Sequence, residues 1–566
     1  MPSGSLRRML FNALVLLATF LHICGVHATA VAIRRAGGPV VSLNYATIEG
    51  ASTGGVDKFL GIPYAQPPVG NLRFRRPRPP LPSSDTILAT TFGNACPQQN
   101  YTLPFIPNLN YTALVTFVSK VNASEDCLFA NVFRPAGVTE NSKLPVVVWF
   151  YGGAFAIGDG SSYDGSAFVQ RSVELGEPLI YINFNYRGNA FGWLAGKEAL
   201  AGGAANLGLY DQKLFLAWIE TYISEFGGDP NKVTVWGHSA GSLSLTAHLI
   251  TNPVNPPFKA AIFQSSYTSP IYKTDDQKHQ ATYDHLVQFT GCTSAPDTLE
   301  CLRVAPYATL KDAINTTPSF LSPNGLDLTW DISIDGDLIK KSLKQYICDG
   351  GYARVPILGG QVDDEGTFFS LYSQSITTDA DVKTFLKAHL YPTATDDQVN
   401  SIADKYSEDP AEGSPFGTGN LSALTPEFKR LAAIQGDHIF HAGRRAAFSK
   451  YAATQNVWSF LWKRRKNLLY IGSVHGGELP EMYGLTGDHV GTDAFVNFIN
   501  HHDPNHPRGS TATSLLSNIT WPKYTLDDKK ILLFSDDAKE EYTTIYDTYR
   551  ADGITTIINV QRALGV

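Results

Sequence analysis

Two stretches of the sequence match Gly-x-Ser-x-Gly, a pattern in which a serine hydroxyl can be presented as a nucleophile. One surrounds Ser239 in VTVWGHSAGS and the other surrounds Ser52 in GASTG. The pattern alone has weak specificity, because a chain with 49 glycines can match it by chance. A serine hydroxyl also needs a base, a group that orients the base, and donors for the oxyanion. The surroundings of each serine therefore decide between them.

Ser239 has the surroundings that a nucleophile requires. The run from Val233 to Trp236 predicts a buried strand, and the apolar residues after Ser239 predict a helix. Small residues on both sides of the serine leave room for a strained strand-to-helix turn. Ser52 instead lies in a glycine-rich link between two predicted strands, VVSLNYATIE and FLGIPYA, which indicates a hairpin turn. We therefore predict Ser239 as the nucleophile.

Candidates for the acid and the base follow later predicted strands. In an open α/β sheet, ligands bind at the carboxyl ends of the strands, so the partners of Ser239 are expected there. Asp363, Asp364 and Glu365 follow RVPILGGQV, and their spacing does not choose among them; a solvated acidic turn is the alternative. His475 lies among glycines in GSVHGGELP, after NVWSFLW, and is the best-placed of the 14 histidines.

The remaining histidines near the predicted site are given other roles. His501, His502 and His506 form the cluster HHDPNHP, which could suggest a metal, but no matching Cys/His set accompanies them. We predict a surface loop there and no metal. His238 directly precedes Ser239, and side chains of neighbouring residues diverge on a tight turn. It is expected to point away from the hydroxyl and to have a structural or tuning role.

Main-chain N–H groups are the expected donors for the oxyanion. One belongs to Ala240, which follows the nucleophile. The others belong to Gly153 and Ala154 in the glycine-rich turn WFYGGAF.

The elements that must carry these residues alternate along the chain. Apolar β-branched runs predict buried strands, and DQKLFLAWIETYISEFGG has helical spacing, with Leu214, Trp218, Ile219 and Ile223 on one face. Buried strands separated by helices predict an α/β fold, a mostly parallel sheet with helices on both faces. Since no linker or repeat is visible, we predict one domain over residues 31–566, with long insertions.

The N-terminus predicts export. Arg7 and Arg8 precede the apolar run MLFNALVLLATFLHIC, and ATA offers a small-x-small cleavage site, so residues 1–30 are predicted to be a signal peptide. A retained signal-anchor is the alternative. No other stretch is apolar enough to span a bilayer, so a secreted, extracellular protein without a stable membrane anchor is expected.

Cysteines and sequons agree with that compartment. Five cysteines remain after cleavage, and pairing of near neighbours suggests Cys96–Cys127 and Cys292–Cys301, with Cys348 free. Six Asn-x-Ser/Thr sequons are candidate glycosylation sites in the secretory route, at Asn100, Asn110, Asn122, Asn315, Asn420 and Asn518.

Composition excludes some partners. The 566 residues are 43% hydrophobic and 17% charged, with a net charge of −7 and no long run of one sign. This is ample for a large core, and it provides no basic face for a nucleic acid. The one basic cluster, KRRK at 463–466, is predicted to be a solvated loop. The sequence does not give the oligomeric state.

Seven segments in order resemble the type-B carboxylesterase/lipase family of α/β-hydrolases: FLGIPYAQPPVGNLRF, EDCLFANVFRP, FYGGAF, NLGLYDQKLFLAWI, FGGDPNKVTVWGHSAGS, DDEGTFF and HGGELPEMYG. The resemblance extends from about Val40 almost to the C-terminus. CPQQN, DDEGTFF and GSPFGTGNLSALTPEFKRLAAIQGD are most similar to the fungal lipases of the Candida rugosa type, which include lipases and sterol esterases.

The resemblance implies a role for each candidate. Ser239 stands at the nucleophile position, Glu365 at the triad acid and His475 at the base, which resolves the choice among the three carboxylates. The three N–H donors and both disulfides also match the family. Two positions depart from its pattern: His238 replaces the usual glutamate, and Ala154 replaces the third glycine of the oxyanion turn. The implied chemistry needs no cofactor.

The implied activity is hydrolysis of carboxylic esters through an acyl-enzyme, as in a lipase or sterol esterase with medium to long acyl chains. An esterase for soluble or aryl esters, similar to feruloyl esterases, is the alternative; a non-catalytic adhesion relative is a further one. Phe368, Phe369 and Leu243 are candidate walls of the substrate pocket, with core packing as the alternative for the two phenylalanines.

The loop between Cys96 and Cys127 corresponds to the mobile flap of the fungal lipases. Its residues Leu114, Phe117, Val118 and Val121 have the spacing of an apolar helical face. Such a face could cover a tunnel or meet a lipid interface; an ordinary helix packed on the core is the alternative.

Overall fold

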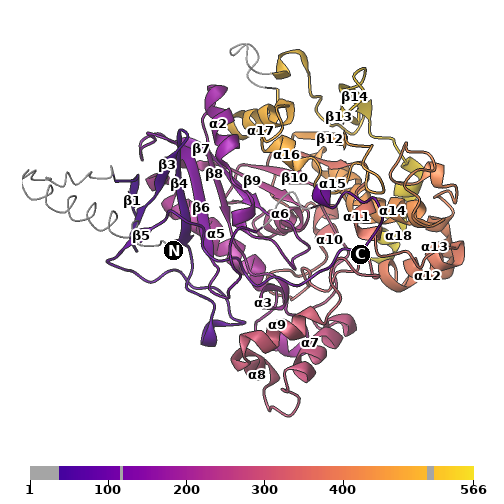
Figure 1. The fold of residues 1–566 in the computed structure, drawn as a ribbon, viewed down its shortest axis with the longest axis horizontal. Coiled ribbons are helices and arrows are strands. Elements are labelled where there is room, and N and C mark those ends of the chain that lie inside the picture. The colour runs from indigo at the N-terminus through magenta and orange to yellow at the C-terminus, as the bar shows by residue number, and fades with distance from the viewer. Residues whose placement is uncertain (1–36, 115–118, 506–514, 566) are drawn as a thin grey trace, which may run out of the picture. The chain divides into compact units, whose positions relative to one another are not determined.

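An 11-stranded sheet runs through the part of the chain that the computed structural model describes, residues 37–114, 119–505 and 515–565 (Figure 1). The predicted signal peptide lies outside the described residues. In chain order the strands are β3 (Ala51–Thr53), β4 (Val56–Pro63), β6 (Phe129–Pro135), β7 (Leu144–Phe150), β8 (Ile180–Phe184), β9 (Gly228–His238), β10 (Ala260–Gln264), β11 (Ile357–Val362), β12 (Val457–Lys463), β13 (Lys530–Ser535) and β14 (Tyr542–Tyr546).

The middle of this sheet is parallel. Its order is β14-β13-β12-β11-β10-β9-β7-β8-β6-β4-β3, and neighbours from β13 to β8 pair in parallel. Antiparallel pairing is confined to β14 at one edge and to β6, β4 and β3 at the other. Every residue of β8, β10 and β11 is buried, as expected for strands covered on both faces. The predicted mostly parallel sheet is confirmed.

Two pairs of helices cover the two faces. Helices α5 (Leu207–Tyr222) and α6 (Ala240–Thr251) contact each other and β9 (Figure 1). Helices α2 (Ser166–Glu174) and α17 (Val490–His501) also contact each other, and pack on β4, β6, β7, β8 and β9. The predicted apolar face of α5 is buried at Trp218 and Ile219. This arrangement leaves the carboxyl ends of the parallel strands open at one edge of the sheet.

The insertions and the ends form further elements. A small separate sheet contains β1 (Val40–Ser42), β2 (Thr47–Glu49) and β5 (Thr86–Leu88). A second apolar cluster is built mainly by α12 (Asp379–Phe385), α13 (Asp396–Ala403), α14 (Phe428–Gly436) and α18 (Ala551–Leu564). The Cys292–Cys301 disulfide joins the segment after α7 (Gln277–Phe289) to α8 (Thr298–Val304), which contains Cys301. None of the described helices combines the length and the apolar character needed to cross a bilayer.

The turn between β9 and α6 depends on glycine. A Cβ on Gly241 would lie 2.0 Å from the carbonyl oxygen of Phe150, and a Cβ on Gly237 would lie 2.8 Å from the carbonyl carbon of Gly241. Both contacts are with backbone, which cannot give way as a flexible side chain can. The first turn of α6 therefore lies directly against the end of β7, with Ser239 in the corner between them.

We expect Gly241→Ala to lower the free energy of unfolding by about 3 kcal/mol, because the added methyl group forces β7 and α6 apart. Gly351→Ala is the matched control, since a Cβ there is 3.4 Å from the nearest atom, in Tyr346, and the change should stay within about 0.5 kcal/mol. Urea denaturation of both variants measures the difference. Equal stability of the two variants would contradict this description of the turn.

Candidate active site

Ser239 lies between β9 and α6, on the wall of a cavity of about 510 Å³. Its backbone has φ 55° and ψ −124°, a strained conformation for a residue with a side chain. Its N–H donates to the carbonyl of Gln264 at 2.9 Å, which fixes the turn against the end of β10. Ser52, the other match to the pattern, lies in the short strand β3, and its hydroxyl donates to Asp57 at 2.5 Å. No helix follows it.

His475 and Glu365 form a hydrogen-bonded pair at the same edge of the sheet. Glu365 follows β11, His475 follows β12, and the distance from Nδ1 of the imidazole to Oε2 of the carboxylate is 2.5 Å. The other oxygen of Glu365 accepts the N–H of Val362 at 3.1 Å. Folding thus brings together two residues that are 110 positions apart in the sequence.

Burial acts on both members of this pair. The side chain of Glu365 is fully buried, and removal from water raises the pKa of its carboxyl, while the Ser265 hydroxyl and the Val362 N–H oppose that rise. Burial lowers the pKa of His475. The imidazole is therefore uncharged at neutral pH, as a proton acceptor must be.

His475 and Ser239 line the same cavity. Within the described part of the chain no hydrogen bond joins the serine hydroxyl to the imidazole. Such bonds are often loose in the absence of substrate and tighten in the reacting complex. The ring of His475 is held on its sides by Phe369 and Phe440, with centroid distances of 5.2 and 4.9 Å.

The two other carboxylates after β11 have different partners. Asp363 and Asp364 each bind Nζ of Lys466 at 2.6 Å, and Asp363 also binds Arg550 at 2.9 Å. Both carboxylates are buried, so the alternative of a solvated acidic turn is wrong. The prediction that KRRK is a solvated loop is also wrong, since its last lysine is needed to neutralise two buried carboxylates and its first arginine, Arg464, binds Glu481 at 2.9 Å.

His238 does not point away from the site, contrary to the expectation from the tight turn. Its ring lines the cavity and lies 4.6 Å from the ring of His475, measured between centroids. The sequence signal for this placement was the position of His238 at the end of a strand, where side chains reach the carboxyl-end edge of the sheet.

In the predicted surface cluster, His501 forms an ion pair with Glu177 at 3.0 Å, whereas His506 lies outside the described residues. Among the described residues no group of three or more His, Cys, Asp or Glu side chains is arranged to hold a metal ion.

The predicted oxyanion donors belong to two segments near the serine. Gly153 and Ala154 line the cavity, and Ala240 begins α6 directly after Ser239. In the described chain none of their three N–H groups donates to another protein atom. Gly153 has φ 116°, and a Cβ there would lie 2.3 Å from the carbonyl oxygen of Ile157, so only glycine fits. Ala154 has φ 54°, so this alanine adopts a left-handed backbone conformation within the turn.

The pocket walls are only partly those predicted from the sequence. Phe368 and Phe369 line the cavity, but Leu243 lines a separate cavity of about 50 Å³, beside Ile271 and Ile439. Leu243 lies in the first turn of α6, where its N–H donates to the carbonyl of Ser239 at 3.1 Å, but its side chain is buried away from the cavity that Ser239 lines. Sequence reasoning missed Phe320, Ile157 and Leu479, which line the cavity from separate segments and carry no common pattern.

The loop between Cys96 and Cys127 forms one wall of the cavity, contributing Gln98, Asn100, Tyr101 and Leu114. Its described part has one short 3-10 helix, Tyr111–Leu114. Of the predicted apolar face, Phe117 and Val118 lie outside the described residues, and Val121 lies outside any helix.

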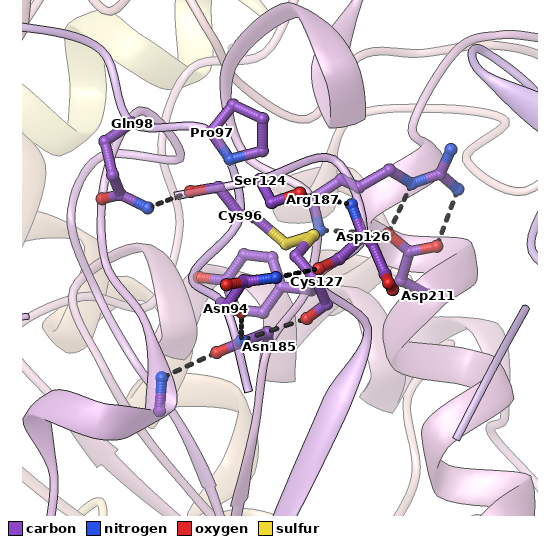
Figure 2. The surroundings of a disulfide bond; sticks show 12 residues. Asn94, Cys96, Pro97, Gln98, Ser124, Asp126, Cys127, Asn185, Arg187 and Asp211 are labelled. Carbon is purple, nitrogen blue, oxygen red and sulfur yellow. Dashed lines mark hydrogen bonds and ion pairs between the residues drawn. A yellow bond between two sulfur atoms is a disulfide. The ribbon is translucent and has the colours of Figure 1, made fainter. Parts of the chain in front are cut away.

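The base of this loop is closely tied to the sheet. Both predicted disulfides are present, and Cys348 is a free thiol. Near the Cys96–Cys127 bond, the Asn185 amide donates to the carbonyls of Asn94 and Cys127 at 2.8 and 3.0 Å (Figure 2). The Gln98 amide donates to the carbonyl of Cys96 at 2.6 Å (Figure 2). Since Gln98 lines the cavity, the disulfide fixes where this wall begins.

Replacing Cys96 and Cys127 together by serine is expected to lower the free energy of unfolding by about 4 kcal/mol and to raise KM, because a loop with a sequence separation of 31 is released at the cavity wall. Replacing Cys292 and Cys301 by serine should lower the free energy of unfolding by about 2.5 kcal/mol, because the sequence separation of these two cysteines is only 9. KM should not change, since neither residue lines the cavity. Denaturation curves and KM for both double variants test this. An unchanged KM in the first would contradict the role of the loop.

Comparison with known proteins places this arrangement in a family. The model of the carboxylesterase family matches residues 37–551. The chain is 36% identical to Secreted lipase 1 of Botryotinia fuckeliana over 512 residues, covering 87% of this chain and 88% of that protein. It is 39% identical to Lipase 5 of Diutina rugosa over 505 residues, covering 87% and 90%.

A solved structure has the same fold. The crystal structure of Aspergillus niger EstA superimposes with a TM-score of 0.79 at 28% sequence identity, covering 94% of this chain and 99% of that one. The resemblance inferred from seven sequence segments is thereby confirmed, as is the α/β-hydrolase fold. The chain belongs to the carboxylesterase family and is a carboxylic ester hydrolase.

Proposed function

We propose that the protein is a secreted serine esterase that cleaves esters of medium to long acyl chains through an acyl-enzyme on Ser239. The observation that carries this proposal is the 2.5 Å hydrogen bond between Glu365 and His475, beside the cavity that Ser239 lines. A base held by a buried carboxylate next to a serine on a strained turn is the arrangement that acyl transfer requires.

In the proposed mechanism His475 accepts the proton of the Ser239 hydroxyl as the oxygen attacks the ester carbonyl. Glu365 holds the imidazole orientation and stabilises its charged form. The N–H groups of Gly153, Ala154 and Ala240 donate to the tetrahedral oxyanion. The imidazolium then protonates the departing alcohol, and water repeats the steps on the acyl-enzyme. Four of these residues, Gly153, Ala154, Ser239 and His475, line the cavity, which supports the proposal.

The cavity supports an acyl chain as the bound group. Its volume of about 510 Å³ lies in the range of small-molecule sites, and several of its walls are apolar. Phe320, Phe368 and Phe369 contribute aromatic surface, and Ile157 and Leu479 contribute aliphatic surface. The relatives carry the names lipase and secreted lipase, which favours lipase-like ester substrates and contact with a lipid interface.

The aromatic walls also support a second candidate, an esterase for soluble aryl esters. Tyr101 and Phe320 pack at 5.2 Å between ring centroids, and Phe320 and Phe368 at 6.4 Å. Such a group of rings can bind the flat face of an aromatic acyl group. A non-catalytic adhesion role is disfavoured by the presence of all three triad residues.

Secretion and glycosylation belong to the same proposal. The two disulfides suit an oxidising compartment, and the relatives include a secreted lipase. Five of the six sequon asparagines are exposed and Asn315 is half-buried. Asn100 lies on the cavity wall, so a glycan there would extend from the rim of the site.

A substrate panel tests the proposed substrate class. We expect kcat/KM for p-nitrophenyl esters to rise from the two-carbon acyl chain to chains of eight or more carbons, and we expect hydrolysis of an emulsified long-chain triacylglycerol. Methyl ferulate is the comparison substrate. Higher kcat/KM for methyl ferulate, with no hydrolysis of the emulsion, would replace the first candidate by the second.

A further inference from the structure

A second buried histidine packs against the proposed base. His238 ends β9, is 6% exposed, and its ring lies 4.6 Å from that of His475 at an angle of 41°. A glycine leaves room for it on one side, since a Cβ on Gly152 would lie only 3.1 Å from Nδ1 of His238. The fold therefore holds the two imidazoles in contact.

The other side of His238 faces a buried carboxyl. Nε2 of His238 lies 4.0 Å from Oε1 of Glu478, whose side chain is fully buried. Gln264 donates to that oxygen at 3.1 Å. In the described chain, Nε2 of His238 and Oε2 of Glu478 have no hydrogen-bond partner. Neither atom is used to hold the described fold, although His238 packs against the base.

The groups that face His238 leave this side of the site uncharged. Burial and the neighbouring His475 lower the pKa of His238, and burial raises the pKa of Glu478 to about 8, with the nearby Glu365 adding to that rise. Glu481 lies beyond Glu478 and is bound by Arg464. Asp159, on the cavity wall, accepts hydrogen bonds from the hydroxyls of Ser161 and Ser162.

We propose that His238 is a positioning residue that supports the ring of His475 and presents an uncharged surface to it, so that His475 stays a proton acceptor in mildly acidic medium. The inference rests on the proposed function of His475 as the base. Its physical basis is that a charge 4 to 6 Å from an imidazole strongly changes where that imidazole titrates. An uncharged neighbour avoids that change.

A carboxylate at position 238 would act on the base in a defined direction. Because position 238 lines the cavity, a carboxylate there can be ionised, unlike the carboxyl of the fully buried Glu478. It would favour the imidazolium form of His475 and raise its pKa, by about one pH unit or more. Activity requires the uncharged imidazole, so the acid limb of the pH profile would move to higher pH. At a pH below the acid limbs of both the wild type and such a variant, an upward shift of about one pH unit lowers the activity of the variant about tenfold.

The test is the pH dependence of kcat/KM for a soluble ester, measured for the wild type, His238→Glu and His238→Gln. Active-site titration with an organophosphonate counts the folded, reactive molecules in each preparation. We expect the acid limb of H238E to move up by about one pH unit, and the limb of H238Q to stay within about 0.2 pH units of the wild type. Coincident limbs for H238E and the wild type, or equal displacements for both variants, would overturn the inference.

A further variant keeps the test decisive if H238E does not fold. Glu478→Gln removes a carboxyl that the inference holds to be uncharged, so its acid limb should match that of the wild type. A limb displaced to lower pH would mean that Glu478 carries a charge beside the base, and the inference would fail. Failure of the proposed function is distinguishable, because His475→Ala would then retain the activity of the wild type.

Discussion

The Ser239→Ala variant is expected to lose a factor of roughly 10⁴ to 10⁶ in kcat/KM for ester hydrolysis. Without the hydroxyl no acyl-enzyme can form, and only binding and the N–H donors of the oxyanion turn remain to accelerate attack by water. The loss should fall on kcat, because Ser239 contributes little to the binding of the ester in the ground state. Initial rates with a soluble p-nitrophenyl ester give both constants.

Ser52→Ala is the matched control for this variant. Ser52 has the same sequence pattern, but its hydroxyl binds Asp57 on the neighbouring strand and it does not line the cavity. Its removal should leave kcat/KM within about a factor of two, since it lies outside the cavity. If the two alanine variants lose equal activity, or if S239A stays active, the nucleophile is not Ser239.

Glu365→Gln is expected to lower kcat by a factor of roughly 10³ to 10⁴, with the fold retained. The glutamine amide can donate to Nδ1 of His475, which places the imidazole proton on Nε2 and removes the lone pair that must accept the serine proton. The buried carboxylate that would stabilise the imidazolium is lost as well. Single-turnover measurements of p-nitrophenol release report this loss in the acylation step directly.

The neighbouring carboxylate provides the comparison. Asp364→Asn removes a charge that binds Lys466 and accepts hydrogen bonds from Ser414 and Ser473, so it should lower stability. The activity of each correctly folded molecule should change far less than in E365Q. A larger loss per active site in D364N would mean that the wrong carboxylate has been assigned to His475.

Local pattern was sufficient to predict the elements that carry the site. The strand before Ser239 is a continuous apolar run, and the small residues around the serine are required by contacts with Phe150 and with the turn itself. The carboxyl ends of β11 and β12 place Glu365 and His475 at one edge, as the parallel sheet predicts. These features depend on short-range sequence and on a general rule of sheet topology.

Features that depend on packing between distant segments were not predictable in the same way. Spacing could not choose among three adjacent carboxylates, because Lys466 and Arg550 occupy two of them only after the chain folds. The same contacts hold Lys466, which the basic cluster KRRK predicted to lie in a solvated loop. Phe320 reaches the cavity from an insertion that no periodic pattern links to the site.

The proposed mechanism requires a covalent bond between the acyl group and Ser239. Its most direct test is reaction of the intact protein with a p-nitrophenyl phosphonate, followed by mass spectrometry of the peptides. We expect one phosphonyl group per molecule, on the peptide that contains Ser239, in step with the loss of esterase activity. A phosphonyl group on any other residue, or full inactivation with Ser239 unmodified, would contradict the proposed mechanism.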